Sequence, residues 1–221
     1  MISGPAHRPS RQPSVGAIAG ALALLLVTLI PLERLEGQIV PNDDWMTIET
    51  QHFRVHFTQP LEALARHSAA TAERAWDLLS RELVPPHGKV DLTVADNVDY
   101  TNGYATPFPS NRIVLYAHPP VDEVSLRYNA DWTELVITHE LTHVFHLDRA
   151  KGIWKLGRYV FGRHPAFFPN AYMPAWVTEG LAVYFESRIT GSGRLEGSEH
   201  YMVARAAAEA GSFPRLGELS S

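Results

Sequence analysis

The sequence predicts an α+β fold, in which a small mixed sheet comes first and the helices that carry the chemistry follow. Three observations lead to this prediction. Short segments with alternating apolar residues lie in the first half of the chain, one long segment there has apolar residues at spacings of three and four, and the second half contains apolar segments of helical length. Strands followed by a run of helices are typical of α+β proteins.

The first elements are expected to be two strands, Trp45–Thr50 and His52–Thr58, because apolar and polar residues alternate in the second of them. A helix with one apolar face is expected from Pro60 to about Leu83. The run Pro85-Pro86-His87-Gly88 ends this helix, since proline and glycine interrupt helical hydrogen bonding.

Two further strands are expected at Lys89–Ala95 and Arg112–Tyr116, separated by a loop over 96–111 that is rich in Asn, Gly and Pro. Within that loop, Asn102–Pro107 leads into the second strand and precedes the helix that carries the histidines. This order suits a sheet edge that pairs with an extended substrate. The alternative is an ordinary loop and strand.

Three helices are expected in the second half, at about 131–148, 175–188 and 198–210, with Asp131 or Thr133 capping the first. The segment Arg149–Trp176 joins the first two helices and contains no acidic residue. It is a connector that packs its aromatic residues on the core, a lid, an interaction surface or a membrane-facing patch, and the connector interpretation is favoured. Its basic and aromatic residues are Arg149, Lys151, Lys155, Arg158, Arg163, Trp154, Tyr159, Phe161, Phe167, Phe168 and Tyr172.

Composition narrows the classes of function. The 221 residues suffice for one sizeable domain with a leader, and the formal net charge is −5. Clusters of Lys and Arg are short, so a nucleic-acid partner is not expected. The chain has no cysteine, which excludes disulfides, cysteine-ligated zinc and thiol catalysis.

The N-terminus predicts export. Arg8 and Arg11 precede an uncharged run, Val15 to Ile30, as in a signal peptide. Its sixteen residues are short for a membrane-spanning helix, which needs ~20. We expect residues 1–37 to be a signal peptide, or a retained signal anchor that associates the chain with a membrane. The protein is then periplasmic, in the cell envelope or secreted, with residues 38–221 as one domain.

The segment His139-Glu140-Leu141-Thr142-His143 is an HExxH motif within an apolar run that is expected to be helical. Residues i and i+4 share one helix face, so both imidazoles can reach one cation, and Glu140 can lie beside the attacking water. Buried histidines without a ligand would leave polar nitrogens unsatisfied. The motif therefore predicts a zinc site with metal ligands His139 and His143 and the catalytic residue Glu140.

A catalytic zinc takes three protein ligands, so a third is needed. Glu179 is the candidate, because it is an acidic residue in the otherwise apolar segment Trp176–Val183, and Gly180 beside it allows a second backbone to approach closely. His146 is the rival. It lies about one further turn, ~4.5 Å of rise, beyond His143, too far along a straight helix to join the other two around one ion.

Supporting roles are expected for four further residues. Asp148 and Glu186 are candidates to accept a hydrogen bond from the second nitrogen of a ligating histidine, the alternative for both being a solvated charge at a helix end. Tyr184 and Tyr201 are candidates for the donor that stabilises the oxyanion, although tyrosine is also common in cores.

The pair of motifs, His139–His143 and Trp176-x-x-Glu179-Gly180-x-Ala182, resembles that of the gluzincins, the clan of thermolysin-like zinc peptidases. The resemblance implies a zincin-like fold, Zn²⁺ held by His139, His143 and Glu179, and Glu140 as general base acting on a peptide or protein substrate. The interval from His143 to Glu179 is longer than in the aminopeptidases of this clan, which indicates an insertion.

The span from about Asp44 to Leu219 resembles the peptidase-MA-like module of bacterial envelope proteins. In several of those proteins a TolB-like or WD40-like β-propeller follows the module. No propeller repeat is present here, and the chain ends soon after the last expected helix. The resemblance thus implies that the domain is incomplete at its C-terminus and that a propeller follows in a longer protein.

The sequence therefore predicts zinc-dependent hydrolysis of peptide bonds. Two alternatives from other classes stay open. One is a catalytically inactive, peptidase-like binding or scaffold module of the cell envelope, although all four expected residues are present. The other is a zinc hydrolase that acts on a non-peptide bond, which the motifs do not exclude.

Overall fold

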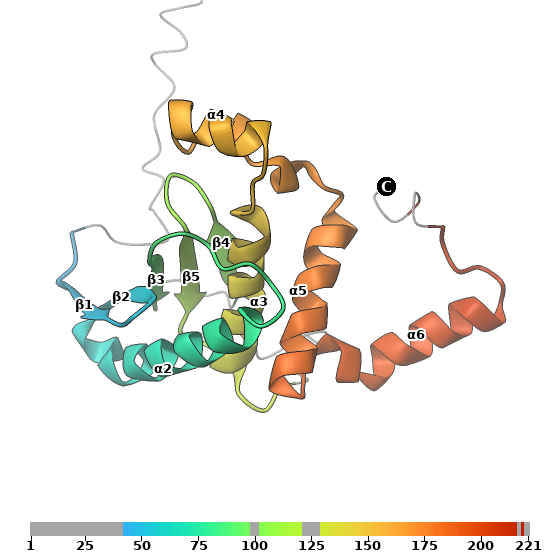
Figure 1. The fold of residues 1–221 in the computed structure, drawn as a ribbon. Helices are drawn as coiled ribbons and strands as arrows, with labels where there is room; N and C mark the ends of the chain where they lie inside the picture. Colours follow the sequence, from blue (N-terminus) through green and yellow to red (C-terminus); the bar gives the residue numbers. More distant parts are fainter. Residues whose placement is uncertain (1–41, 98–101, 121–128, 216–217, 219–221) are drawn as a thin grey trace, which may run out of the picture. The chain divides into compact units, whose positions relative to one another are not determined.

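A single mixed sheet of five strands, accompanied by five α-helices, forms the described part of the chain (Figure 1). The computed structural model describes residues 42–97, 102–120, 129–215 and 218, all within the unit Gln38–Ser221. This arrangement confirms the predicted α+β class. The predicted leader, residues 1–37, lies outside the described residues.

The sheet has antiparallel outer pairs and parallel inner pairs. Its order is β1 (Trp45–Glu49), β2 (Phe53–Thr58), β3 (Val90–Ala95), β5 (Arg112–Tyr116) and β4 (Gly103–Thr106). The prediction of an uninterrupted loop over 96–111 is wrong, because β4 lies in it. This four-residue strand depends on its pairing with β5, in which Tyr104 lies opposite Val114, rather than on local sequence preference.

The alternating apolar residues of β2 and β3 form one buried face of the sheet. Phe53 lies opposite Val90 and Val55 opposite Leu92, and all four are fully buried. Two helices, α2 (Glu62–Leu79) and α3 (Trp132–Leu147), pack on this face. Trp76 of α2 connects the layers, since its ring makes edge contacts with Phe53 at 5.7 Å and with Phe145 of α3 at 5.0 Å between centroids.

The first helix differs from its predicted bounds at both ends. A 3₁₀ turn, Gln59–Leu61, precedes α2, and α2 ends at Leu79 instead of about Leu83. Hydrogen-bonded turns continue to Leu83. The residue before Pro85 is restricted to extended conformations, so the apolar periodicity extends further than the helix itself.

The helices that carry the motifs agree closely with the prediction. Asp131 caps α3 by accepting a hydrogen bond from the backbone N–H of Glu134 at 3.2 Å. Helix α5 (Ala175–Thr190) packs along α3 and ends at Gly191, which has a left-handed φ of 64°. Helix α6 (Ser198–Glu209) follows and contains no buried residue.

The linker Arg149–Trp176 contains a helix that the sequence did not predict, α4 (Ile153–Phe161), and two 3₁₀ turns, Pro165–Phe167 and Pro169–Tyr172. The connector interpretation holds for the second half of this linker, where Phe168 is fully buried between Phe108 and the guanidinium of Arg158. Helix α4 instead exposes its apolar residues. Within the described residues, no helix is both long enough and apolar enough to cross a bilayer.

Candidate metal centre

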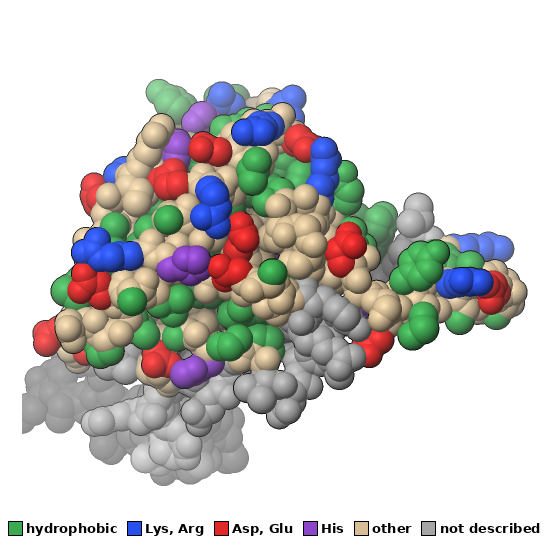
Figure 2. Space-filling view, turned by 90° about the horizontal axis from the view of Figure 1, so that it is seen from below, with side chains coloured by type: hydrophobic (Ala, Val, Ile, Leu, Met, Phe, Trp, Pro, Cys, Tyr) green, Lys and Arg blue, Asp and Glu red, His purple; other side chains and the backbone are tan. Residues whose placement is uncertain are grey.

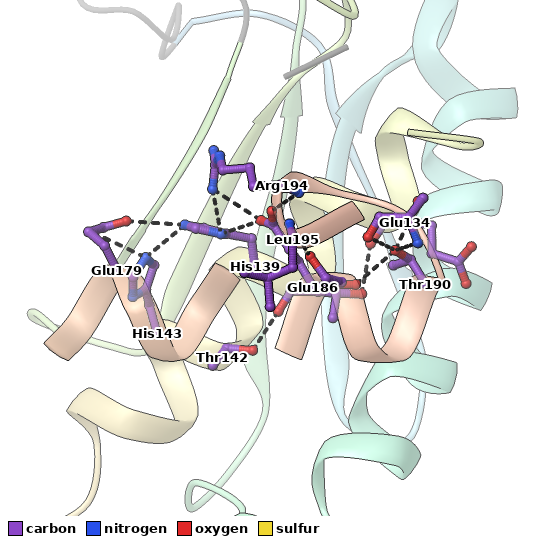
Figure 3. A network of polar contacts seen from close by, with 12 residues as sticks. Glu134, His139, Thr142, His143, Glu179, Glu186, Thr190, Arg194 and Leu195 are labelled. Carbon is purple, nitrogen blue, oxygen red and sulfur yellow. Dashed lines mark hydrogen bonds and ion pairs between the residues drawn. The ribbon is translucent and has the colours of Figure 1, made fainter. Parts of the chain in front are cut away.

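Helices α3 and α5 bring three potential metal ligands together (Figure 3). His139 and His143 lie one turn apart on α3, with their Nε2 atoms 3.1 Å apart. From α5, Glu179 places one carboxylate oxygen 3.4 Å from Nε2 of His139 and the other 3.6 Å from Nε2 of His143. One donor atom of each residue lies within 4.8 Å of the other two, so this group could hold a metal ion.

The three side chains differ in exposure. Those of His139 and His143 are 8% and 10% exposed, whereas that of Glu179 is 59% exposed. The imidazoles thus form the inner wall of the site, and the carboxylate forms its rim. A site that is open on one side leaves room for water and substrate, as a catalytic metal requires.

A fully buried carboxylate supports the first histidine from behind. Glu186 lies two turns after Glu179 on α5, and its Oε2 is 2.7 Å from Nδ1 of His139 (Figure 3). Such a bond orients the ring so that Nε2 faces the metal position. Arg194 balances the charge, because its Nη1 lies 3.2 Å from Oε2 of Glu186 and its backbone N–H donates to Oε1 at 3.2 Å.

The ionisation of His139 and Glu179 reflects these contacts. Burial lowers the pKa of His139, but hydrogen bonds with Glu179 and Glu186 outweigh it and raise the pKa to about 9. Hydrogen bonds from His139 and His143 hold the pKa of Glu179 well below its ordinary 4.5. Without a metal, His139 therefore favours its protonated form and Glu179 its ionised form, so a proton lies between them where a cation would bind.

The predicted catalytic residue, Glu140, lies next to His139 on α3 and is buried beneath the edge strand β4. A Cβ atom built on Gly103 of β4 would lie 3.2 Å from Cγ of Glu140 and 3.0 Å from both the Val136 side chain and the Val114 carbonyl. Burial raises the pKa of Glu140 despite the neighbouring histidines. A carboxyl group of this kind can both accept and return a proton.

Three residues that the sequence prediction connected with the metal site do not have the contacts expected of them. His146 is not part of the ligand group, and Asn170 donates to its backbone carbonyl at 2.7 Å. Asp148 contacts Arg158 and Arg163, not a ligating histidine, so its expected supporting role was wrong. Asp148 lies five residues past His143, at the C-terminal end of α3, where both arginines of the linker contact it. Among the described residues, nothing outside α5 lies within 4 Å of a Cβ built on Gly180, so the expected close approach of a second backbone is not found there.

Tyr184 and Tyr201, the two candidates for the oxyanion donor, make no contact with the ligand group among the described residues. Tyr184 accepts a hydrogen bond from Arg188, which also pairs with Glu82 in the turns that follow α2. Tyr201 lies on α6 and is 67% exposed. Neither is therefore assigned to the oxyanion role.

Sequence reasoning missed Arg194, the cation that pairs with Glu186. This residue follows the turn after α5, and Gly193 makes the return possible: its φ is 104°, and a Cβ there would lie 2.9 Å from Oγ of Ser187. A buried carboxylate requires a partner, so the sequence signalled that a cation was needed. It gave no indication of which arginine would supply it.

No protein-family model matches the chain, and no curated protein matches it.

Proposed function

We propose that this chain is a gluzincin-type zinc metallopeptidase domain of zincin-like fold, exported to the cell envelope or secreted. The observation that carries the proposal is the convergence of His139, His143 and Glu179 from two helices, with Glu140 next to the first histidine. Two imidazoles and one carboxylate are a donor set that suits zinc, and the open rim suits a catalytic site.

The sheet edge supports a peptide as substrate. Strand β4 is the last strand of the sheet and packs against α3 on the side of Glu140. Its pairing with β5 uses one of its two edges. An extended peptide that added to the other edge would run past Glu140, and main-chain hydrogen bonds would hold it in register.

The chemistry follows from these positions. A zinc ion at the ligand group, when bound, acidifies water and polarises the scissile carbonyl. Glu140 would take the proton of the attacking water and deliver it to the leaving amine, which its burial and raised pKa favour. Glu186 would keep the ring of His139 oriented during this proton transfer.

Metal content tests the site. We expect about one zinc per chain by elemental analysis of protein purified without chelators, and clearly less in Glu179→Ala. The matched control is Glu196→Ala, which removes an exposed glutamate that is not part of the ligand group. Wild-type protein that is folded but binds no zinc, or that binds iron instead, would contradict the proposal.

Activity tests the reaction class. Digestion of a peptide library by the zinc-loaded chain should give defined fragments, and Glu140→Gln should lower the rate by about 10²–10⁴-fold while zinc content stays unchanged. A zinc-loaded wild type that binds peptides without cleaving them would be a binding module. Cleavage of esters or other non-peptide bonds alone would indicate a different hydrolase.

A further inference from the structure

Helix α4 presents an apolar face that nothing in the described structure covers. Ile153, Leu156 and Val160 follow one another at spacings of three and four, which places them on one side of the helix. They are 76%, 62% and 61% exposed. Such a contiguous apolar face on the surface is typical of a binding surface.

Gly157 and Arg158 hold α4 to the body of the domain. Gly157 is buried against Phe167, whose ring would collide with any side chain at that position. Arg158 donates to the carboxylate and the backbone carbonyl of Asp148. Because these contacts fix the rotation of the helix, the apolar face stays turned outward.

The surroundings of α4 are basic. No Asp or Glu occurs between Arg149 and Thr178, although the whole chain has a net charge of −5. Arg149, Lys151 and Lys155 are exposed, and no described carboxylate pairs with them. They are among the residues that line a cleft of about 710 Å³ beside α4. The face shown in Figure 2 differs, since acidic and basic side chains are interspersed on it.

We propose that α4 and its basic flank bind the surface of an anionic lipid bilayer. An interfacial helix combines an outward apolar face with lysines and with aromatic side chains that lie at headgroup level. Trp154, Tyr159 and Phe161 of α4 are exposed as these aromatic side chains would be. Nine residues span ~14 Å, so the helix would lie in the interface and not cross it.

The charge distribution favours lipid over protein as the occupant. A bilayer with anionic headgroups complements a basic flank over its whole length. A second copy of this chain would place two basic flanks together, which is unfavourable at close range. The proposal does not depend on the metal site, although the linker that contains α4 begins six residues after His143.

The absence of cysteine allows a local test in the full chain. An environment-sensitive fluorophore is attached to Leu156→Cys, and the matched control carries it at Leu195→Cys, a leucine of similar exposure that follows α5. Vesicles contain phosphatidylcholine alone or phosphatidylcholine and phosphatidylglycerol in equal parts. Quenching by doxyl groups on the lipid chains reports contact with the bilayer at each label, whatever the N-terminal segment does.

We expect a blue shift and quenching at position 156 with the anionic vesicles only, and neither at position 195. Lys151→Gln and Lys155→Gln should each raise the lipid concentration needed by about fivefold. An unchanged label at 156 on vesicle-bound chain would overturn the proposal. An equal response to neutral vesicles would also overturn it. A blue shift that grows with protein concentration in the absence of vesicles would overturn it as well, because it would show that a second copy of the chain binds α4.

Discussion

Glu186 and His139 form a buried pair in which a carboxylate oxygen lies 2.7 Å from Nδ1 of the imidazole. Glu186 is completely buried, and the His139 side chain is 8% exposed. Buried polar groups need hydrogen-bond partners, and here Glu186 is shared between His139 and Arg194. The pair also determines which nitrogen of His139 faces Glu179.

Glu186→Gln should weaken zinc binding by about 10–100-fold, because the amide lacks the charge that makes the imidazole a strong ligand. Competition with a chromophoric chelator measures the affinity. Glu196→Gln is the control, since this exposed glutamate follows the same helix. Equal affinities for the two variants would show that Glu186 only supports the fold.

The metal-free chain should lose stability as the pH rises. The pKa of folded His139 is raised from 6.5 to about 9, so its protonated form contributes stability that is fully present below pH 6.5 and is lost as the pH rises through about 9. Urea unfolding after dialysis against chelator checks this dependence. His139→Gln should flatten the profile between these pH values, and an unchanged slope in that variant would refute the assignment.

Asp148→Ala should destabilise the domain by about 3–5 kcal/mol, because it leaves Arg158 and Arg163 without their buried carboxylate. Its Oδ1 lies 2.5 Å and 2.9 Å from these arginines, and its side chain is 1% exposed. Zinc bound per folded chain should not change. Lost zinc in a variant that remains folded would restore the role in the metal centre that the sequence suggested.

Gly103→Ala should slow peptide hydrolysis more than it lowers zinc content. The added Cβ would lie 3.0 Å from the Val114 carbonyl and 3.2 Å from Cγ of Glu140, so β4 or Glu140 has to move. We expect a cost of about 1–3 kcal/mol in stability, as for overpacked cores. Ala105→Gly, at another position in β4, is the comparison. Unchanged kcat in Gly103→Ala would remove the link between the edge strand and Glu140.

The pair Glu73–His52 should make the domain sensitive to acid. Burial raises the pKa of Glu73, but hydrogen bonds from Thr50 and His52 outweigh it, and the pKa lies below its ordinary 4.5. The stability that this carboxylate contributes is therefore present above pH 4.5 and lost as the pH falls through the folded value. Glu73→Gln should be less stable at neutral pH and lose less on acidification, as thermal unfolding from pH 6 to 3 would show.

The elements that sequence alone predicted share one property: their own residues specify them. The alternating Phe53, Val55 and Phe57 predicted β2, and the apolar run around the histidines predicted α3 to within a residue at each end. The HExxH spacing and the isolated carboxylate Glu179 predicted the three residues that converge. Helical periodicity and the cost of burying a charge suffice for such inferences.

The missed features depend on partners distant in sequence. Strand β4 exists through its pairing with β5. Asp148 was a candidate partner for a ligating histidine, because its contacts with Arg158 and Arg163 arise only in the fold. Arg194 reaches Glu186 through a glycine turn whose direction no local pattern indicates. Helix α4 was missed because its apolar residues do not pack on the core, and its mixture of basic and aromatic residues was interpreted as a connector.

The three candidate ligands lie on two helices that are joined by a long linker, and this arrangement affects how fast the protein would be degraded. A metal bound to both His143 and Glu179 would close a loop of 36 residues (179 − 143) in the manner of a cross-link. Chains without metal would open this loop more often and expose 144–178 to proteolysis. The availability of the metal would then determine the lifetime of the protein, independently of any substrate.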